Sequence, residues 1–438
     1  MSRHRPSARA SAVRVLRQID QRRGFSNRIL AEELARSGLD RRDRGFVTNL
    51  VYGALRHRAR LDALIDRVAR RPAGIRGKAR EILRVAVYEL RELEHPPHAA
   101  ISEATGLIAG FDRGGGLVAA AQAILSTIAA EGEALDASLA EGKPLDVLAG
   151  RWSVPRWLAG RWLKRLGPER ALARARALAD VPSLDLRVDL GRIAAQEVAA
   201  RLREDVGGVV EAAPGQPQAL RVRGGGDLTQ HPLFAAGLVS IQALGAQQPA
   251  RALGPRPGER ILDACAGMGT KTLQLAELMA RRGTIVAADQ SADRLAEHAE
   301  LLARGELAAE ALELSVVRGD LTGEVADVDD VERFDGVLLD APCTGLGNLA
   351  RHPELRWTRE FADIAACAAL QRRLLDACWG RVRPGGRLVY AVCSLEPEEG
   401  EALVHSFVAE RGLRVAEEAT WSPEDDACDG FYLARIEA

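Results

Sequence analysis

The pattern of apolar positions divides the chain into a helical first part and a mixed second part. Between residues 7 and 130, apolar side chains recur every three or four residues, as they do when one face of a helix is buried. The clearest stripes are Val13, Leu16 and Ile19; Val47, Leu50, Val51 and Leu55; and Leu117, Ala120, Ala121, Ile124 and Ile128. Proline and glycine interrupt them near residues 72–77, 96–97 and 114–116. We therefore predict an all-α domain of about six or seven helices over residues 1–130.

Two further regions precede the second part of the chain. Residues 131–150 are polar and small, which favours a linker between domains. Residues 151–248 begin with a helical pattern and continue with alternating residues at 184–188 that are typical of a strand. A second helix is expected at 191–204 and a hairpin at 209–222. We predict a small α+β subdomain for this region.

From residue 249 to residue 438, short apolar runs alternate with helical patterns. This rhythm predicts an α/β fold with a mostly parallel sheet that is covered by helices on both faces. The strands are expected at 260–265, 284–289, 312–317, 334–340 and 387–393, and the helices at 270–282, 291–304, 360–382 and 397–411. Ligands of such sheets bind beyond the carboxyl ends of the strands. The residues that follow each strand are therefore the candidates for a functional site.

Composition narrows the class of protein. The 438 residues are 47% hydrophobic and 28% charged, which is ordinary for a globular protein and excludes a disordered or collagen-like chain. No apolar run approaches the roughly 18 residues that a membrane span needs, and the basic N-terminus lacks the apolar core of a signal peptide. The 6 cysteines are scattered and form no Cys-x-x-Cys pair. We therefore expect no metal, no membrane partner and a cytoplasmic location.

The net charge of −1 hides an asymmetry along the chain. Residues 1–91 contain 23 Lys and Arg against 9 Asp and Glu, whereas the remaining residues contain 37 against 52. A basic block on a nearly neutral protein favours a polyanionic partner such as nucleic acid. A solvated, arginine-rich helical surface would have the same composition.

The first strand is joined to its helix by a glycine loop, Asp263-Ala-Cys-Ala-Gly-Met-Gly-Thr-Lys-Thr272. Gly267 and Gly269 allow the backbone to approach a ligand, and the following helix begins with free N–H groups. The loop is neither a P-loop nor a full dinucleotide fingerprint, because threonines stand where each motif needs glycine. By itself, the loop could be only a tight turn from strand to helix.

Aspartates end the second, third and fourth strands, at Asp289, Asp320 and Asp340. An acid at the end of the second strand can accept hydrogen bonds from the ribose hydroxyls of an adenosine. Asp320 could meet the adenine amino group. One such aspartate is most often a cap or turn residue, but three of them beside a glycine loop favour an adenosine-containing cofactor.

Two cysteines follow the fourth and fifth strands, at Cys343 and Cys393. A buried cysteine is usually a small hydrophobic core residue. A cysteine just beyond the end of a central parallel strand instead faces the ligand crevice, so two of them favour a functional role. Cys367 and Cys378 lie on a predicted helix beside leucines and are expected in the core. Cys428 lies in an acidic loop.

These residues belong to longer stretches that carry a family resemblance. The chain resembles the bacterial 16S ribosomal RNA cytosine-5 methyltransferases of the RsmB (Sun/Fmu) type, within the NOL1/NOP2/Sun family, in the stretches DACAGMGTKT, VAADQS, RGD, LLDAPCTGLGNLARHPELRW, VYAVCSLEPEEGE and DGFYLARI. The stretch RWSVPRWLAGRWLKRLG is similar to the same group, and the helical N-terminus resembles its NusB-like RNA-binding domain. The resemblance covers almost the whole chain.

The resemblance implies a Rossmann-like domain at 249–438 that uses S-adenosyl-L-methionine to methylate C5 of a specific cytosine in 16S rRNA. It also implies an unassembled or partly assembled small subunit as the RNA partner. In this reading Cys393 is the nucleophile, Cys343 assists release of the product, and Asp340 borders both the cofactor and the base. The implied cofactor contacts are Cys265, Ala266, Gly267, Met268, Gly269, Thr270 and Lys271 for the methionine part, Asp289 for the ribose, Asp320 for the adenine side, and Asp340.

The chain also departs from the family pattern. The usual Ala-Ala-Pro-Gly-Gly-Lys-Thr reads Ala-Gly-Met-Gly-Thr-Lys-Thr, the usual Thr before the nucleophile is Val392, and the usual Gln-Asp ahead of the domain is Gln242-Ala243. Two alternatives are therefore open: methylation of another rRNA site or of tRNA, and an inactive RNA-binding factor for ribosome assembly. Both cysteines, the three aspartates and Lys271 are retained, which favours an active enzyme.

Overall fold

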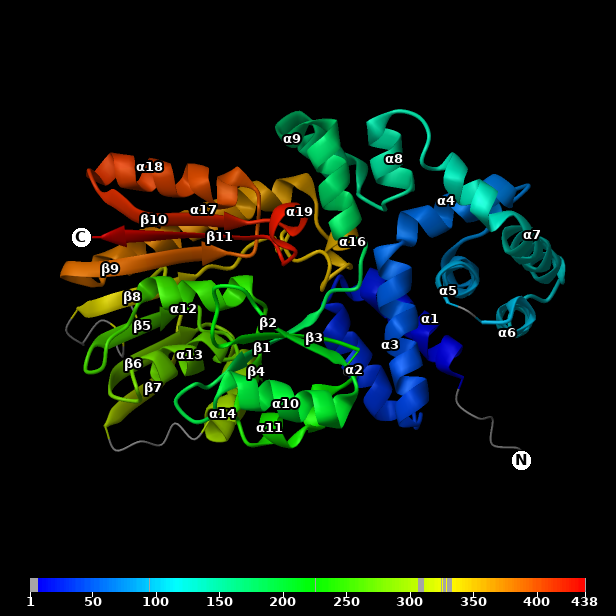
Figure 1. Ribbon diagram of the computed structural model, residues 1–438. Coiled ribbons are helices and arrows are strands. Elements are labelled where there is room, and N and C mark those ends of the chain that lie inside the picture. Colours follow the sequence, from blue (N-terminus) through cyan, green and yellow to red (C-terminus); the bar gives the residue numbers. More distant parts are fainter. Residues whose placement is uncertain are drawn as a thin grey trace. The chain divides into compact units, whose positions relative to one another are not determined.

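The computed structural model describes residues 7–93, 95–224, 226–305, 311–323, 325, 328 and 333–437. The chain forms two compact units, whose elements are labelled in Figure 1. Unit 1 comprises Met1–Val181 and Leu349–Arg359, and unit 2 comprises Pro182–Asn348 and Glu360–Ala438. The first six residues of the predicted helical domain lie outside the described residues. Within the described part of the chain, no helix is both long and apolar enough to cross a lipid bilayer.

Unit 1 is helical, in agreement with the spacing of its apolar residues. Its elements are α1 (Ala8–Arg22), α2 (Ser26–Arg36), α3 (Arg41–Arg56), α4 (Arg58–Val68), η1 (Pro72–Gly74), α5 (Gly77–Glu92), α6 (Pro97–Ala109), α7 (Gly116–Ser138), α8 (Pro144–Gly150), α9 (Arg156–Ala177) and α16 (Leu355–Thr358). Ser7 and Asp40 cap the N-termini of α1 and α3 by accepting hydrogen bonds from backbone N–H groups. Helix α5 packs against α1, α3, α4, α6 and α7, so its apolar stripe lies in the middle of the unit's core.

The backbone differs from the linker predicted at residues 131–150. Helix α7 continues to Ser138 and α8 occupies Pro144–Gly150, so only a short turn separates the two helices. Small residues do not preclude a helix here, because several are alanines, which have the highest helix propensity. Helix α9 also belongs to unit 1 rather than to the α+β region, and it is broken at Gly167, ahead of Pro168.

A segment that is distant in sequence completes unit 1. This segment, Leu349–Arg359, interrupts the sequence of unit 2 and includes α16. Its Arg356 is 2% exposed and donates hydrogen bonds to the backbone carbonyls of Arg56, Trp152, Ser153 and Leu178. The indole N–H of Trp357 donates to the carbonyl of Leu55 at 2.8 Å. The Arg-His-Pro-Glu-Leu-Arg-Trp run is therefore an internal part of the helical unit, which the sequence did not reveal.

Unit 2 begins with a small antiparallel sheet in the strand order β2-β3-β1-β4. Its strands are β1 (Leu184–Val188), β2 (Val209–Ala212), β3 (Ala219–Arg223) and β4 (Val239–Ile241). The helices of this region are α10 (Ala195–Val206), η2 (Leu228–Gln230), α11 (Pro232–Ala235), η3 (Gly245–Gln247) and α12 (Gln248–Leu253). The strand predicted at 184–188 and the hairpin predicted at 209–222 are both present.

The large sheet of unit 2 has the strand order β10-β11-β9-β8-β5-β6-β7. Its strands are β5 (Arg260–Ala264), β6 (Gly283–Asp289), β7 (Leu312–Arg318), β8 (Phe334–Asp340), β9 (Val382–Val392), β10 (Arg414–Trp421) and β11 (Phe431–Glu437). Strands β5 to β9 pair in parallel, as predicted, whereas β11 pairs antiparallel with β9 and with β10. The antiparallel pair at the C-terminus was not predicted.

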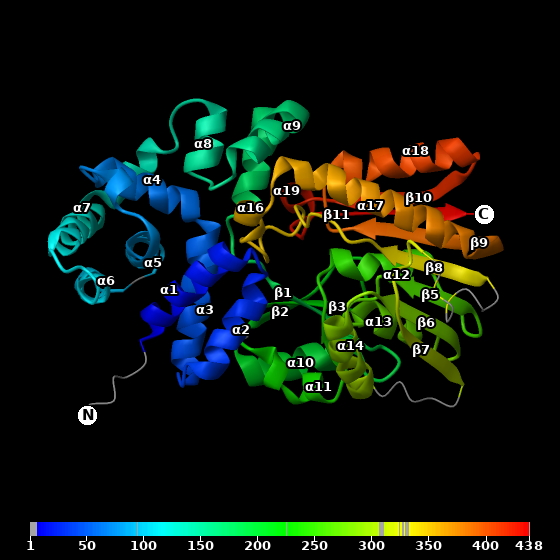
Figure 2. The ribbon, with the colours of Figure 1, turned by 180° about the vertical axis from the view of Figure 1, so that it is seen from behind.

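Helices cover both faces of the large sheet, as the views from the front and from behind show (Figures 1 and 2). The helices of this part of unit 2 are α13 (Thr270–Leu278), α14 (Ala292–Arg304), α17 (Phe361–Gly380), η4 (Pro397–Glu399), α18 (Glu401–Arg411) and α19 (Pro423–Asp426). Strand residues alternate between two cores: Leu262 and Leu339 pack in the core that contains α17 and α18, whereas Ile261 and Leu338 pack in the core that contains α12 and α13.

The strand order places a topological switch point between β5 and β8. The chain runs outward from β5 through β6 to β7, and then returns to the other side of β5 with β8 and β9. Such a switch point opens a crevice beyond the carboxyl ends of the two central strands. Here those ends carry the glycine loop after β5 and Asp340 at the end of β8.

Candidate active site

The glycine loop turns sharply from β5 into α13. Cys265, Gly267 and Gly269 all have positive φ angles, of 64°, 57° and 83°. Gly269 is the N-cap of α13, and a Cβ on it would lie 2.2 Å from Cδ2 of His298. Glycine is required at this position both by its backbone conformation and by the imidazole packed against it. Burial lowers the pKa of His298, which favours the neutral form of the ring.

Asp289 holds the glycine loop in place. Its carboxylate is buried at the end of β6 and accepts hydrogen bonds from the backbone N–H of Gly267 at 2.9 Å and of Ser291 at 2.8 Å. Each carboxylate oxygen can accept a further hydrogen bond, so these contacts leave acceptor capacity for a ligand. The predicted position at the strand end is correct, and the aspartate also links the loops after β5 and β6.

Asp320 follows β7, beside the end of β6. The backbone N–H and the hydroxyl of Thr322 donate to its Oδ1 at 3.0 and 2.8 Å. These hydrogen bonds lower the pKa of Asp320, which forms a local turn. Gly319, the residue after β7, donates a backbone hydrogen bond of 3.2 Å to the carbonyl of Asp289 at the end of β6, so Asp320 is one residue away in sequence from this contact.

Lys271 and Asp340 form an ion pair in the switch-point crevice. The ammonium of Lys271 lies 2.5 Å from Oδ2 of Asp340. Burial alone would lower the pKa of Lys271, but the attraction of Asp340 outweighs it and raises the pKa, so the side chain stays cationic. Asp263 lies fully buried nearby and accepts a hydrogen bond from the hydroxyl of Thr272 at 2.6 Å. Its burial raises the pKa of Asp263 to about 7.

The two cysteines that follow β8 and β9 lie in contact. Their sulfur atoms are 3.3 Å apart, and both side chains are only partly exposed. Backbone hydrogen bonds join the two loops, because the N–H of Ala341 donates to the carbonyl of Ala391 and that of Gly347 to the carbonyl of Cys393. The hydrogen bond to Cys393, together with burial, raises the pKa of the Cys343 thiol well above its usual value. The structure thus brings together the two thiols that the sequence singled out.

The remaining cysteines lie elsewhere. Cys378, a residue of α17, is buried in the core, as predicted, and burial raises its pKa to about 12. Cys367 lies on the same helix but is partly exposed. Cys428 donates to the carbonyl of Asp429 at 3.3 Å and packs near the small sheet. None of these three contributes to the thiol pair.

A buried carboxylate under the two cysteine loops was missed by sequence reasoning. Glu399, in η4, is 0% exposed and accepts hydrogen bonds from Thr344 and Ser394, the residues that follow the two cysteines. Its only signal in the sequence was its place in an acidic run, Glu-Pro-Glu-Glu, which is typical of a solvated surface. Arg187 was also missed: it is buried in β1, pairs with Glu277, and donates to the carbonyl of Thr270 at 2.9 Å, at the start of α13.

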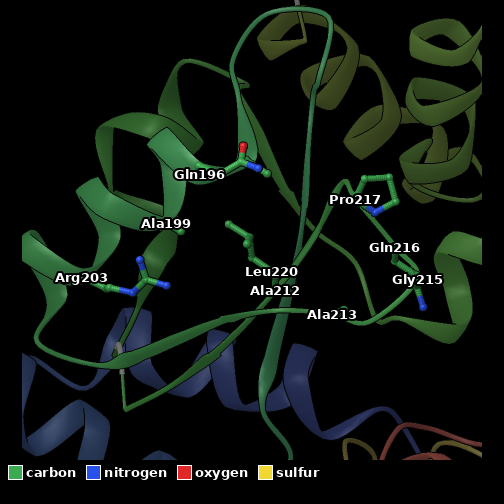
Figure 3. A pocket seen from close by; sticks show the side chains of 10 residues that line it. Gln196, Ala199, Arg203, Ala212, Ala213, Gly215, Gln216, Pro217 and Leu220 are labelled. Carbon is green, nitrogen blue, oxygen red and sulfur yellow. The ribbon is translucent and has the colours of Figure 1, made fainter.

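A cavity of about 490 Å³ lies away from these residues, between α10 and the β2–β3 turn. In Figure 3, Gln196 and Arg203 extend from α10 on one side, and Gln216 and Pro217 lie on the other. Alanine, glycine and proline make up much of its lining. It contains none of the predicted site residues.

Comparison with known proteins relates both units to one enzyme family. A model of the family described as 16S rRNA methyltransferase RsmB/F matches residues 250–437, and a model of the NusB family matches residues 6–140. The ribosomal RNA small subunit methyltransferase B of Vibrio cholerae is 33% identical over 446 residues, which cover 98% of this chain and 96% of the relative. The enzyme of the same name from Erwinia tasmaniensis is 32% identical over 438 residues, with 97% of each chain covered.

The same fold occurs in a solved structure. The crystal structure of PH0851 superposes with a TM-score of 0.80, at 23% identity, and covers 99% of each chain. The NusB-like helical domain and the Rossmann-like methyltransferase domain predicted from the sequence are therefore confirmed. The identity of 32 to 33% to curated relatives over nearly their full length shows that the chain belongs to the 16S rRNA methyltransferase RsmB/F family, and in this chain a NusB-family match precedes the methyltransferase domain.

Proposed function

We propose that this protein uses S-adenosyl-L-methionine to methylate C5 of a specific cytosine in 16S rRNA, with Cys393 as the nucleophile. The observation that carries the proposal is the 3.3 Å contact between the sulfur atoms of Cys343 and Cys393 at the ends of two adjacent parallel strands. Cytosine C5 is a poor nucleophile until a thiolate adds at C6, so this chemistry calls for thiols at the site. Methyl transfer to a protein or to a small molecule does not.

The residues around the glycine loop fit the cofactor. The backbone at Gly267 and Gly269 carries no side chain beside the N-terminus of α13, and Asp289 keeps acceptor capacity for ribose hydroxyls. Residues 265–271 would enclose the methionine part, and Asp320 would lie on the adenine side. When bound, S-adenosylmethionine supplies an electrophilic methyl group on a sulfonium centre.

The two thiols act in successive steps of the reaction. The thiolate of Cys393 adds to C6, the electron pair of the C5–C6 double bond moves to C5, and C5 takes the methyl group. Removal of the C5 proton by Cys343 then restores the double bond and expels the Cys393 thiolate. The hydrogen bond to Cys393 is the largest cause of the raised pKa of Cys343. Because that hydrogen bond breaks once Cys393 is bonded to the base, Cys343 is deprotonated more easily at the step that needs a base.

Lys271 and Asp340 supply the charges that this sequence of steps requires. The charges of Lys271 and Cys393 interact, so a thiolate at Cys393 faces an ammonium group. Asp340 accepts a hydrogen bond from Lys271 at 2.5 Å, and the pair would stabilise the negative charge that develops on the ring by supplying a hydrogen bond to N3 of the cytosine. The Lys271–Asp340 pair would therefore stabilise both the Cys393 thiolate and the covalent adduct between Cys393 and the cytosine.

The helical unit would position the RNA. Residues 1–91 carry 23 Lys and Arg against 9 Asp and Glu, which suits contacts to phosphates without readout of sequence. A paired target base would have to leave its stack to reach the thiols. An unassembled or partly assembled small subunit offers such unpaired or accessible bases.

The test is methyl transfer from labelled S-adenosylmethionine to unmethylated 16S rRNA, followed by mapping of 5-methylcytosine. We expect Cys393→Ala to reduce transfer by about a thousandfold or more, while binding of a cofactor analogue is unchanged. Cys343→Ala should retain addition and trap a covalent protein–RNA adduct on a denaturing gel. Cys367→Ala, on the partly exposed side of α17, is the matched control and should behave as wild type.

Each alternative predicts a different result. Label in tRNA or at another rRNA position would redirect the substrate assignment while keeping the chemistry. RNA binding without any methyl transfer would favour an inactive assembly factor. Transfer that survives in both Cys393→Ala and Cys343→Ala would rule out the two-thiol mechanism.

A further inference from the structure

Glu399 connects the two loops that carry the thiols. Its Oε1 accepts a hydrogen bond from the backbone N–H of Thr344 at 2.8 Å, and its Oε2 accepts from the Thr344 hydroxyl at 2.5 Å. The hydroxyl of Ser394 donates to the same Oε2 at 2.5 Å. Thr344 directly follows Cys343, and Ser394 directly follows Cys393. One carboxylate therefore bridges the residues adjacent to both sulfur atoms.

The carboxylate is itself fixed from below. Gln371 of α17 donates through Nε2 to Oε1 of Glu399 at 3.1 Å and to the carbonyl of Pro342 at 3.0 Å. The hydroxyl of Tyr390, in β9, donates to the backbone carbonyl of Glu399 at 2.6 Å. Glu399, Gln371 and Tyr390 are each 0% exposed. The bridge therefore rests on buried groups of β9 and α17 rather than on the mobile end of a surface side chain.

The chemical type of the side chain matters at this position. Four donors from three residues converge on the two oxygens of Glu399, and a carboxylate can accept from all of them. An amide of the same shape has only one acceptor oxygen, and its NH₂ group would face donors. Glutamine would therefore keep the volume of the site and remove the bridge.

We propose that Glu399 is the positioning residue that holds the loops of Cys343 and Cys393 together. With the loops held in this way, the Cys393 sulfur can reach C6 of the cytosine and the Cys343 sulfur can then reach the proton on C5. The inference rests on the proposed two-thiol reaction. Glu399 acts through Thr344 and Ser394, and neither of these two residues takes part in the covalent steps. A misplacement of either thiol by about an ångström would slow the chemical steps strongly, because the reacting atoms must meet in line.

The experiment measures the thiol geometry without RNA or cofactor. The full-length protein is treated with diamide, which takes two electrons and two protons from a pair of neighbouring thiols as its N=N bond is reduced and the S–S bond forms. The rate of formation of the Cys343–Cys393 disulfide is followed by alkylation and mass spectrometry. The variants are Glu399→Gln and, as the matched control, Glu398→Gln, which changes the exposed neighbouring glutamate.

We expect Glu399→Gln to slow disulfide formation by at least about tenfold and Glu398→Gln to leave it unchanged. Methyl transfer by Glu399→Gln should fall in kcat by a similar factor, with the KM for S-adenosylmethionine unchanged. A reduction of stability alone would not produce this split in a protein that is folded during the assay. Ser394→Ala and Thr344→Val, which each remove one donor, should give smaller reductions and serve in place of Glu399→Gln if that variant does not fold.

Two results would overturn the inference: a wild-type rate of disulfide formation in folded Glu399→Gln and in both single-donor variants, or a wild-type protein whose two thiols do not cross-link at all. A failure of the proposed function is distinguishable from either. In that case the wild-type enzyme transfers no methyl group to RNA cytosine, while the diamide reaction still reports whether Glu399 holds the thiols together.

Discussion

At the scale of single residues, the site depends on charges that are kept away from water. Asp263 is fully buried beside the Lys271–Asp340 pair, and burial raises its pKa to about 7. A carboxyl group whose pKa is higher in the folded than in the unfolded protein binds its proton more tightly when folded. Its contribution to stability is therefore fully present below about pH 4 and declines as the pH rises from about 4 to about 7. The stability of the folded protein should therefore fall as this one carboxyl loses its proton.

Asp263→Asn should remove this pH dependence. Relative to wild type, the variant should become more stable between about pH 5 and about pH 8, with a change in the free energy of unfolding of at most about 4 kcal/mol. The measurement is urea unfolding of both proteins across that pH range. Asp293→Asn, at an exposed position of α14, is the control. Parallel pH profiles for wild type and Asp263→Asn would contradict the argument.

At the scale of elements, the 349–359 segment decides how the sequence is divided between the units. It supplies Arg356, whose side chain is buried. This burial lowers the pKa of Arg356 to about 9. In the described part of the chain, its guanidinium donates to four backbone carbonyls from three separate stretches of unit 1. One guanidinium thereby provides hydrogen-bond donors to the backbone carbonyls at the ends of α3 and α9 and in the turn after α8.

Arg356→Met should destabilise unit 1 by about 3 kcal/mol or more, because it keeps the apolar volume and leaves buried carbonyls without donors. Hydrogen–deuterium exchange of peptides from α3 and α9 should accelerate accordingly. Arg42→Met, at an exposed position of α3, should change stability by no more than about 0.5 kcal/mol. Exchange rates equal to wild type in Arg356→Met would show that the hydrogen bonds to these carbonyls contribute little.

At the scale of the whole molecule, charge and chemistry are separated along the chain. The basic residues concentrate in the first 91 positions, within unit 1, whereas the thiols and the glycine loop belong to unit 2. Binding of phosphates by cationic side chains releases counterions, so the RNA affinity depends on salt concentration. Substitutions in the basic block should therefore alter RNA affinity without altering the chemistry of the thiols.

Replacing Arg41, Arg42 and Arg44 with Gln removes three exposed cations from the start of α3. We expect weaker binding of 16S rRNA and an unchanged kcat at saturating RNA. The dependence of log affinity on log salt should become shallower by about 0.7 to 0.9 for each phosphate that is no longer neutralised. Filter binding between about 50 and 200 mM salt measures the slope. Arg414→Gln, with a side chain that is 78% exposed in β10, is the control. An unchanged slope would show that other residues bind the phosphates.

The sequence by itself determined the type of most elements and the edge of the sheet at which the candidate site residues lie. Periods of 3.6 and 2 residues reflect which side of an element is buried, so α3 and β5 to β8 could be predicted from local pattern. Because parallel strands all end at one edge, the sequence alone assigns Asp289, Asp340, Cys343 and Cys393 to one crevice.

Only the tertiary structure decided which distant segments meet. The antiparallel β10–β11 pair, the 349–359 segment in unit 1, and Glu399 beneath both thiol loops depend on contacts between residues far apart in sequence. Local periodicity contains no information on such contacts. A buried glutamate and an exposed one look alike in a run of acidic residues, because burial is a property of the surroundings that the fold creates and not of the side chain.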